Sequence, residues 1–302
     1  MTKPLTIVGS VALDTIETRA GKREDILGGA ATYIAIASGF FGPVNLVAVV
    51  GDDFPDAYVA LLKKSNVDTA GLKQEPGRTF RWAGKYADDF STRETLNTEL
   101  GVFEKFDPEI PEVYKDSDFA LLGNIHPALQ LKVLDALSEK TFVAADTMNL
   151  WIDITPDVLA QMIRRVDLLV INDEEAVMLS GEQQIAVAAE KIQADGGPKH
   201  LIIKRGEHGA WLFAEDTRFF VPALPLRDVI DPTGAGDTFA GGLMGYLASK
   251  GEASLENIKT GMIYGAAVAS RAVEAFGADE FAKATKAEVD RRFEEICKLT
   301  TI

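Results

Sequence analysis

The chain has 302 residues, of which 47% are hydrophobic, enough to bury a sizeable core in one large domain or two small ones. Its formal charge of −15 argues against nucleic acid or anionic membranes as partners, because both attract a basic surface. The single cysteine, Cys297, excludes an intrachain disulfide. Residues 5–9 read as a short strand instead of the long apolar region of a signal peptide. We therefore expect a globular protein, of a size common among enzymes, with a cytoplasmic location.

Short apolar runs alternate with helical periodicity along the chain, a pattern typical of an α/β fold whose parallel sheet is covered on both faces. Strands are predicted at residues 5–9, 46–50, 119–122, 142–145, 168–171 and 201–204, and helices at 30–41, 54–64, 129–138, 156–165, 185–194, 237–249, 255–273 and 288–299. No internal repeat or flexible linker interrupts the pattern. We expect a single domain over residues 1–302.

Residues 26–51 carry no charged side chain and exceed the about 20 apolar residues that cross a bilayer. Gly39, Gly42, Pro43 and Asn45 divide this segment into a helix and a strand. Both elements are apolar all round, so the segment is predicted to lie in the core of an α/β domain.

Residues 11–27 and 78–103 break the alternation, since they carry β-prone and polar residues without helical periodicity. We expect them to form the strands of a small lid at one edge of the main domain. Ligands of open α/β sheets lie beyond the carboxyl ends of the strands, where such a lid would exclude water. An exposed lid edge could also pair with a second copy, which gives the hypothesis of a homodimer through the lid.

Residues 231–237, Asp-Pro-Thr-Gly-Ala-Gly-Asp, immediately precede a predicted helix. The small residues Gly234, Ala235 and Gly236 allow backbone N–H groups to point at one place, where the positive end of the helix dipole adds to them. Such a cup suits a phosphoryl group, and Asp237 stands where it could take a proton from an attacking hydroxyl. Taken alone, the segment is equally compatible with an ordinary strand-to-helix turn.

Four motifs, in the same order along the chain, resemble those of the ribokinase-like (PfkB) carbohydrate kinase family. They are Gly28-Gly29 before an apolar helix, Asn-Asp-Glu-Glu at 172–175, Lys-Arg-Gly-Glu-His-Gly at 204–209, and the 231–237 loop. The resemblance covers essentially the whole chain. It implies a ribokinase-like three-layer fold, with a mostly parallel central sheet flanked by helices and a small β-lid.

The activity that the resemblance implies is ATP-dependent phosphorylation of a hydroxymethyl group on a sugar or sugar-like polyol. A nucleoside kinase of the same family is the alternative. A catalytically inactive, nucleotide-binding regulatory protein is the alternative of another class, although a carboxylate kept beside an anion cup argues against it. ATP and Mg²⁺ are the implied cofactors, and dependence on a monovalent cation stays open.

The resemblance also implies roles for individual residues. Asp237 would be the general base, with Gly234, Ala235 and Gly236 as the anion hole. Substrate binding is implied for Asp14, Gly28, Gly29 and Asn149. Nucleotide binding is implied for Asn172, Lys204, Gly206, Gly209, Thr233 and Gly277. Glu175 would hold Mg²⁺ through water, which suits oxygen ligands.

Several of these positions also have a purely structural interpretation. Asn172 and Glu175 have the spacing of a helix capping box, and Asp14 is compatible with a turn aspartate. Asp146 follows a predicted strand and is a weaker site candidate. Tyr33 stands where many relatives have an asparagine that contacts substrate hydroxyls. The identity of the phosphoryl acceptor is therefore open.

Overall fold

The structure is a computed structural model that describes residues 4–301. The strands are β1 (Leu5–Val8), β2 (Ala12–Thr18), β3 (Gly21–Gly28), β4 (Val44–Gly51), β5 (Val67–Glu75), β6 (Arg81–Tyr86), β7 (Arg93–Glu99), β8 (Phe119–Leu122), β9 (Phe142–Ala145), β10 (Leu168–Asn172), β11 (His200–Lys204), β12 (Ala210–Ala214) and β13 (Thr217–Val221). The α-helices are α1 (Ala30–Gly39), α2 (Asp56–Lys64), α3 (Pro127–Ala136), α4 (Asn149–Ile154), α5 (Pro156–Ile163), α6 (Asp173–Ser180), α7 (Ile185–Ala194), α8 (Ala235–Lys250), α9 (Leu255–Ala272), α10 (Gly277–Phe281) and α11 (Lys286–Leu299).

Nine of the described strands form the main sheet, in the order β13-β12-β11-β10-β9-β8-β1-β4-β5. The strands from β11 to β5 run parallel to one another, whereas β12 and β13 are antiparallel additions at one edge. Their central strands are apolar on both faces because helices cover both faces. The carboxyl ends of the parallel strands therefore meet at one edge of the sheet.

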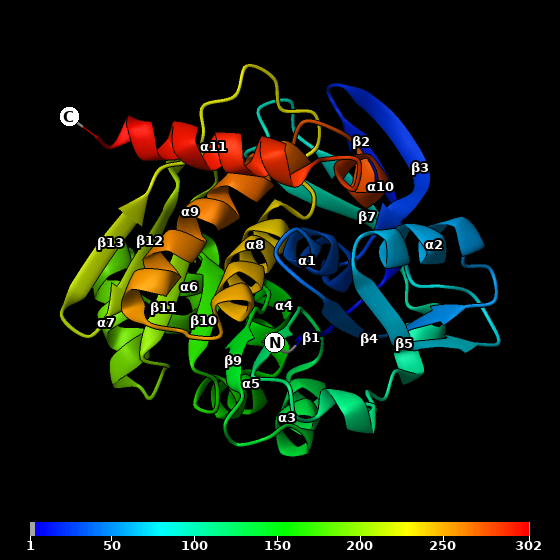
Figure 1. The fold of residues 1–302 in the computed structure, drawn as a ribbon, viewed down its shortest axis with the longest axis horizontal. Coiled ribbons are helices and arrows are strands. Elements are labelled where there is room, and N and C mark those ends of the chain that lie inside the picture. The colour runs from blue at the N-terminus through cyan, green and yellow to red at the C-terminus, as the bar shows by residue number, and fades with distance from the viewer. Residues whose placement is uncertain (1–3, 302) are drawn as a thin grey trace.

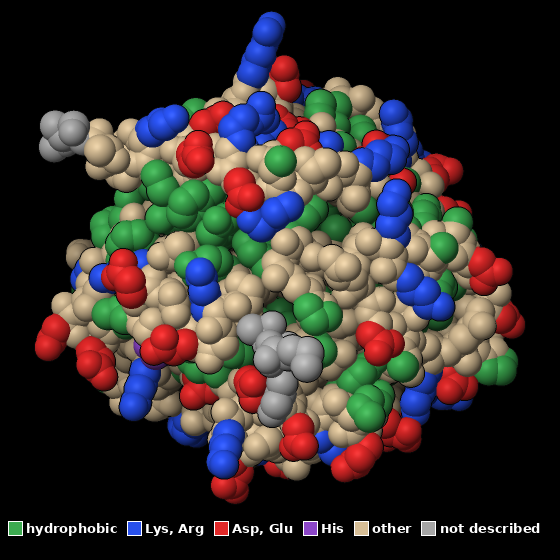
Figure 2. All heavy atoms as spheres, viewed as in Figure 1, with side chains coloured by type: hydrophobic (Ala, Val, Ile, Leu, Met, Phe, Trp, Pro, Cys, Tyr) green, Lys and Arg blue, Asp and Glu red, His purple; other side chains and the backbone are tan. Residues whose placement is uncertain are grey.

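Two hydrophobic cores separate the sheet from its two helical layers, as the predicted three-layer fold requires (Figure 1). One face packs against α1, α2, α8 and α9, with α10 and α11 beyond them. The opposite face packs against α3, α5, α6 and α7. On the side viewed in Figure 2, acidic and basic side chains are interspersed, and hydrophobic side chains gather beneath α11.

The lid is a second sheet of four described strands, in the order β3-β2-β6-β7. These strands fall within the two segments predicted for the lid, at residues 11–27 and 78–103, apart from Gly28 at the end of β3. A small cluster of Ile16, Tyr86 and Phe276 packs the lid against the loops near residues 230 and 276. The Thr18 hydroxyl donates a hydrogen bond to the Ile230 carbonyl at 2.8 Å, so the lid is docked on the main domain.

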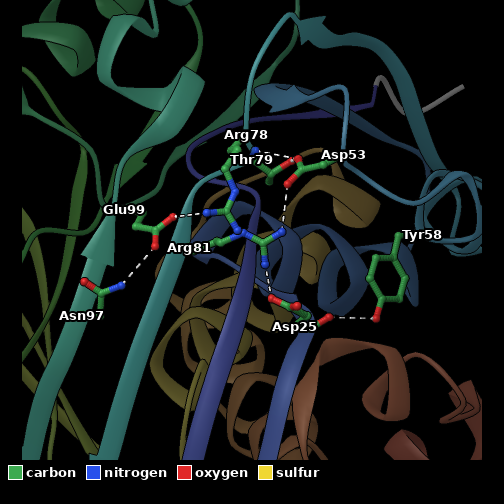
Figure 3. Close-up of polar contacts among 8 residues, drawn as sticks. All are labelled: Asp25, Asp53, Tyr58, Arg78, Thr79, Arg81, Asn97 and Glu99. Atoms are coloured by element: carbon green, nitrogen blue, oxygen red, sulfur yellow. Dashed lines mark hydrogen bonds and ion pairs between the residues drawn. The ribbon is translucent and has the colours of Figure 1, made fainter.

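An ion-pair network joins the base of the lid to the main domain (Figure 3). The Arg81 guanidinium lies between Asp25 of the lid and Asp53 of the loop after β4, at 2.8 Å from the Asp53 carboxylate. That carboxylate also accepts hydrogen bonds from the backbone N–H and the hydroxyl of Thr79. The Arg81 side chain is only 17% exposed and Asp53 27%, so the pair with Asp53 is partly shielded from water and salt, whereas the Asp25 carboxylate is 65% exposed. Together they fix the lid at its base.

Several features of the fold differ from the sequence-based predictions, and strands β12 and β13 and helix α6 are also missing from the predicted elements. Strand β5 is not predicted, because its buried residues, Val67 and Gly71, alternate with exposed polar residues at an edge of the sheet. The short helices α4 and α10 are too brief to show periodicity. The predicted helix 54–64 begins only at Asp56, after Pro55. Residues 26–51 divide as predicted into the end of β3, α1 and β4, and no described helix is long and apolar enough to span a membrane.

Candidate active site

Two strands of the sheet, β9 and β11 on either side of β10, deliver charged side chains to the N-terminus of α8. Ala144 on β9 and Ile202 on β11 belong to the core that faces α8. Side chains alternate along a strand, so Asp146 and Lys204, two residues further on, point to the same side. The Lys204 Nζ lies 3.4 Å from an Asp146 carboxylate oxygen. Parallel strands thus place an ion pair at the carboxyl edge of the sheet.

The loop at residues 231–237 forms the start of α8, as predicted. Gly234 has a φ of 73°, in the left-handed region, and a methyl group built there would lie 2.4 Å from the Tyr33 ring. A methyl group at Gly236 would lie 2.9 Å from the Lys204 Nζ. The Asp231 carboxylate accepts a hydrogen bond from the Thr233 N–H at 2.9 Å and holds the loop in shape. Backbone N–H groups of the first helical turn, which have no partners within a helix, therefore lie beside an ammonium group.

Asp237 lies in the first turn of α8 and is only partly exposed. The pKa of its carboxyl is raised to about 7, chiefly by burial and also by the nearby Asp146, while Lys204 and Arg93 oppose the shift. Arg93 belongs to lid strand β7. A carboxylate with a pKa near neutrality is suited to take a proton at physiological pH.

Asn172 and Glu175 form the capping box that their spacing allows. The Asn172 side chain accepts from the Glu175 N–H, and the Glu175 carboxylate accepts from the Asn172 N–H, each at 2.8 Å. The pKa of Glu175 is raised to about 7, chiefly by burial and also by Asp146, while Lys204 and the hydrogen bond from the Asn172 N–H oppose the shift. Glu175 is therefore both a structural cap and a member of the charged cluster around Lys204.

Asp14 and the di-glycine segment form the other side of the site. The Asp14 side chain on β2 is buried, with the residue 4% exposed, and the Gly29 N–H hydrogen-bonds to its carboxyl. A methyl group at Gly28 would lie 1.9 Å from that carboxyl, so only glycine fits there. Burial raises the pKa of Asp14 to about 7, with Asp231 and Asp237 contributing. The predicted substrate residues Asp14, Gly28 and Gly29 are thus brought together near Asp237.

Thr233, within the loop at residues 231–237, and Gly277 connect this loop with the lid. The Thr233 hydroxyl donates a hydrogen bond to the Tyr86 hydroxyl of the lid at 3.0 Å. The Gly277 N–H donates to the Asp231 carboxylate at 3.4 Å, and a methyl group there would lie 3.0 Å from Ile26 of lid strand β3. In the described structure both residues support the loop, and their predicted contacts with the nucleotide stay predictions.

Asn149, Gly206 and Gly209 make local contacts. Asn149 is exposed at the start of α4, where its side chain accepts from the Leu150 N–H. Gly206 and Gly209 form the turn between β11 and β12 with positive φ, and a methyl group at Gly209 would lie 2.2 Å from the Val221 carbonyl oxygen. Glycine is therefore required at residue 209 by the backbone itself, and a role for these three residues in binding stays a prediction.

Three residues gain importance from contacts that the sequence could not reveal. Tyr33 packs on Gly234, and its hydroxyl is buried without a hydrogen-bond partner among the described residues. Asp146 pairs with Lys204, and Arg93 reaches the surroundings of Asp237 from the lid. The signal available in the sequence for Asp146 was its position directly after a predicted strand, on the ligand side of the sheet.

The charged side chains fit a divalent cation that arrives with a phosphate ligand. Asp146, Glu175 and Asp237 are three carboxylates around the single ammonium of Lys204, and the pKa values of all three are raised by burial. This excess of negative charge would be relieved by Mg²⁺. Within residues 4–301, no group of three or more His, Cys, Asp or Glu side chains is arranged to hold a metal directly. Coordination through water and phosphate oxygens is the arrangement that fits.

Comparisons with known proteins agree with this geometry. The model of the pfkB family carbohydrate kinases matches residues 6–285. The cytidine kinase of Thermococcus kodakarensis is 33% identical over 85% of this chain and 93% of its own length. An Escherichia coli protein in complex with ATP and Mg²⁺ shares the fold with a TM-score of 0.80 at 18% identity, covering 97% of this chain and 99% of the other. The ribokinase of Arabidopsis thaliana, complexed with ribose and ATP, has a TM-score of 0.77 at 19% identity over 97% and 99% of the two chains. This chain is a phosphotransferase that belongs to the pfkB family of carbohydrate kinases.

Proposed function

We propose that this protein transfers the γ-phosphoryl group of ATP to the hydroxymethyl group of a nucleoside. The observation that carries the transfer chemistry is Asp237, a carboxyl with a pKa of about 7 in the first turn of α8, directly after the glycine loop. A base, an anion-binding loop and a nearby cation are the parts that phosphoryl transfer needs, because its catalysis rests on positioning and charge stabilisation.

In the proposed reaction, Asp14 and the Gly28–Gly29 backbone bind the sugar hydroxyls of the acceptor. Asp237 accepts the proton of the attacking hydroxyl as its oxygen forms a bond to the γ-phosphorus. The bond to the bridging oxygen breaks and ADP leaves, while the N–H groups at Gly234, Ala235 and Gly236 stabilise the charge on the transferred group. Mg²⁺ bound with ATP would neutralise phosphate charge, and Glu175 would hold one of its waters.

The choice of a nucleoside over a simple sugar rests on two observations. The cytidine kinase relative is similar over nearly the whole of both chains, which brings forward the alternative that the sequence motifs alone placed second. In addition, Trp82 and Tyr86 lie four residues apart on lid strand β6 and therefore share one face of that strand. Trp82 pairs with Asp14 on β2, so both aromatic residues lie on the same face of the lid as Asp14. Aromatic side chains on that face offer a surface against which a base can pack.

A sugar kinase is the second candidate, and it is favoured because a lid side chain already covers one face of the Trp82 ring. The central carbon of the Arg93 guanidinium already lies 5.3 Å from the centroid of the Trp82 ring and covers one face of the indole. A base would have to use the other face or displace Arg93. A sugar that contacts only Asp14 and the glycine backbone would need neither.

The test is ADP release with Mg²⁺-ATP across nucleosides, sugars, sugar acids and inositols, with Asp237→Asn beside the wild type. Loss of the general base is expected to lower turnover about 10²- to 10⁴-fold while acceptor binding is kept. Tryptophan fluorescence on adding nucleoside without ATP, with Trp82→Phe as control, separates the two acceptor classes. Turnover with sugars alone, and no change in Trp82 fluorescence, would show that the acceptor is a sugar and not a nucleoside. An active Asp237→Asn variant would refute the role of Asp237 as general base.

A further inference from the structure

The Lys204 ammonium is buried in the candidate site with fewer partners than it can use. Its side chain is 16% exposed, and an ammonium group has three N–H donors. Among residues 4–301 its only hydrogen-bond partner is Asp146, at 3.4 Å. Charge-assisted N–H···O bonds are normally about 2.7–2.9 Å long, so this pair is loose. The ammonium therefore keeps donors available for a further acceptor.

The position of Lys204 shows where that acceptor would lie. A methyl group at Gly236 would come within 2.9 Å of the Nζ, so the ammonium lies against the middle of the glycine loop. Asp237, the next residue, is close enough for Lys204 to lower its pKa. An anion held by the N–H groups of this loop would meet the ammonium directly.

We infer that Lys204 is a catalytic residue whose ammonium leaves its loose contact with Asp146 to donate hydrogen bonds to the phosphoryl group in transfer. The inference rests on the proposed phosphoryl transfer at Asp237. As the acceptor oxygen bonds to the γ-phosphorus and the bridging oxygen leaves with ADP, Lys204 keeps its proton and changes only its hydrogen-bond partners. Its charge offsets the charge on the equatorial oxygens, which is a different role from binding the nucleotide.

The surrounding charges keep Lys204 ready for this role. Burial alone would lower the pKa of its ammonium, but Asp146, Glu175 and Asp237 outweigh burial and raise it. The lysine thus stays charged when the site is empty of phosphate. Gln130 donates hydrogen bonds to the carbonyls of Gly123 and Asp146, which holds the Asp146 backbone in place. The resting position of the ammonium is therefore defined by the fold.

The experiment compares Lys204→Met and Lys204→Arg with wild type in calorimetric binding of two ligands, Mg²⁺-ADP and Mg²⁺-ADP with aluminium fluoride. The second ligand mimics the planar phosphoryl group. Lys204→Met is expected to lose about 100-fold in affinity for the fluoride complex, as for removal of one donor from an oxyanion hole, while its affinity for ADP changes little. Lys204→Arg, which keeps the charge, should lose less.

Lys191→Met is the matched control, because Lys191 lies on the surface of α7 and pairs only with Asp195, directly after that helix, among the described ion pairs. Removing Lys204 leaves carboxylates without their cation, so the double variant Lys204→Met, Asp146→Asn restores the balance and is tested if the single variant does not fold. It should show the same selective loss. On the acceptor found by screening, kcat should fall about 100-fold with the KM for ATP nearly unchanged.

The outcomes separate this inference from the proposed function. Equal losses for both ligands would make Lys204 a nucleotide ligand only and overturn the inference, as would unchanged binding of the fluoride complex. A selective loss in a protein that phosphorylates no nucleoside would support Lys204 while removing the nucleoside proposal. The binding readout needs no acceptor, so neither result depends on the other.

Discussion

Gly236→Ala should separate the stability of the fold from the chemistry of the site. Gly236 lies in the first turn of α8 with an ordinary φ, so alanine is compatible with its backbone. Alanine is better than glycine within a helix by up to about 1 kcal/mol, and somewhat less in a first turn. For a chain of this size the gain amounts to at most about 2–4 °C in Tm. The variant is therefore expected to fold at least as well as wild type.

The same methyl group is expected to lower the catalytic rate while it leaves the stability of the fold unchanged or slightly higher. It would lie 2.9 Å from the Lys204 Nζ, and because this atom ends a flexible side chain, the ammonium moves instead of the backbone. Ordinary van der Waals contact requires a shift of about half an ångström, and a misplacement of about 1 Å can cost about 10²-fold in rate. We therefore expect a loss of about tenfold or more in kcat, from crowding of both the ammonium and the anion.

The assay is ADP release beside thermal unfolding, with Gly42→Ala as control, since a methyl group at Gly42 would meet nothing within 4 Å. Gly234→Ala gives the contrasting case. Its φ of 73° and the Tyr33 ring at 2.4 Å should lower stability as well as activity. If Gly236→Ala kept its kcat within twofold at unchanged Tm, the cation and the transferred phosphoryl group could not lie where we place them.

Further predictions concern pH, the lid and assembly. Because Asp237 must be ionised to accept a proton, kcat/KM should fall about tenfold per pH unit below a pKa of about 7, and Asp237→Asn should abolish this limb. A raised carboxyl pKa favours the protonated native state, so stability is lost as pH rises from about 4 to 7. Asp237→Asn should therefore raise Tm at pH 8, by an amount that shrinks towards pH 4; an equal effect at both pH values would exclude this cause. Arg81→Met should loosen the lid and raise the KM for the acceptor several-fold at an unchanged Tm, whereas an unaltered KM would show that the pair with Asp53 does not position it. A dimeric mass in light scattering, lost when charges are added to β7, would support pairing through the lids, and a monomeric mass would end that hypothesis.

The layered fold was predictable because its strands and helices carry strong local patterns. Apolar runs such as residues 168–171 and helical spacing such as residues 255–272 are decided by neighbours in sequence. Strand β5 was not predictable in this way, since an edge strand with polar residues and Gly71 has no distinctive period. The order of strands in the sheet, with β1 between β8 and β4, likewise follows from packing over long distances.

The candidate site was predictable where a motif keeps its residues together. Gly234 to Asp237 lie in one loop, and Gly28 with Gly29 in another, so sequence alone located both. The pairing of Asp146 with Lys204 joins residues 58 positions apart and could not be read from either segment. The Thr233 contact with Tyr86 spans 147 positions for the same reason. Such contacts depend on the register of whole strands, which short patterns do not specify.

The arrangement of the site along the chain has a consequence for biosynthesis. Its parts extend from Asp14 near the start to Gly277 near the end, and β1 lies in the middle of the sheet with β8 as a neighbour more than a hundred residues later. Contacts this distant in sequence form slowly, and a chain emerging from the ribosome lacks the strands that would cover the first ones. The apolar N-terminal third of the chain therefore stays exposed until strands such as β8 have been synthesised. Phosphotransfer activity should therefore appear only once Gly277 has emerged, and a nascent fragment that ends before Gly277 should show none.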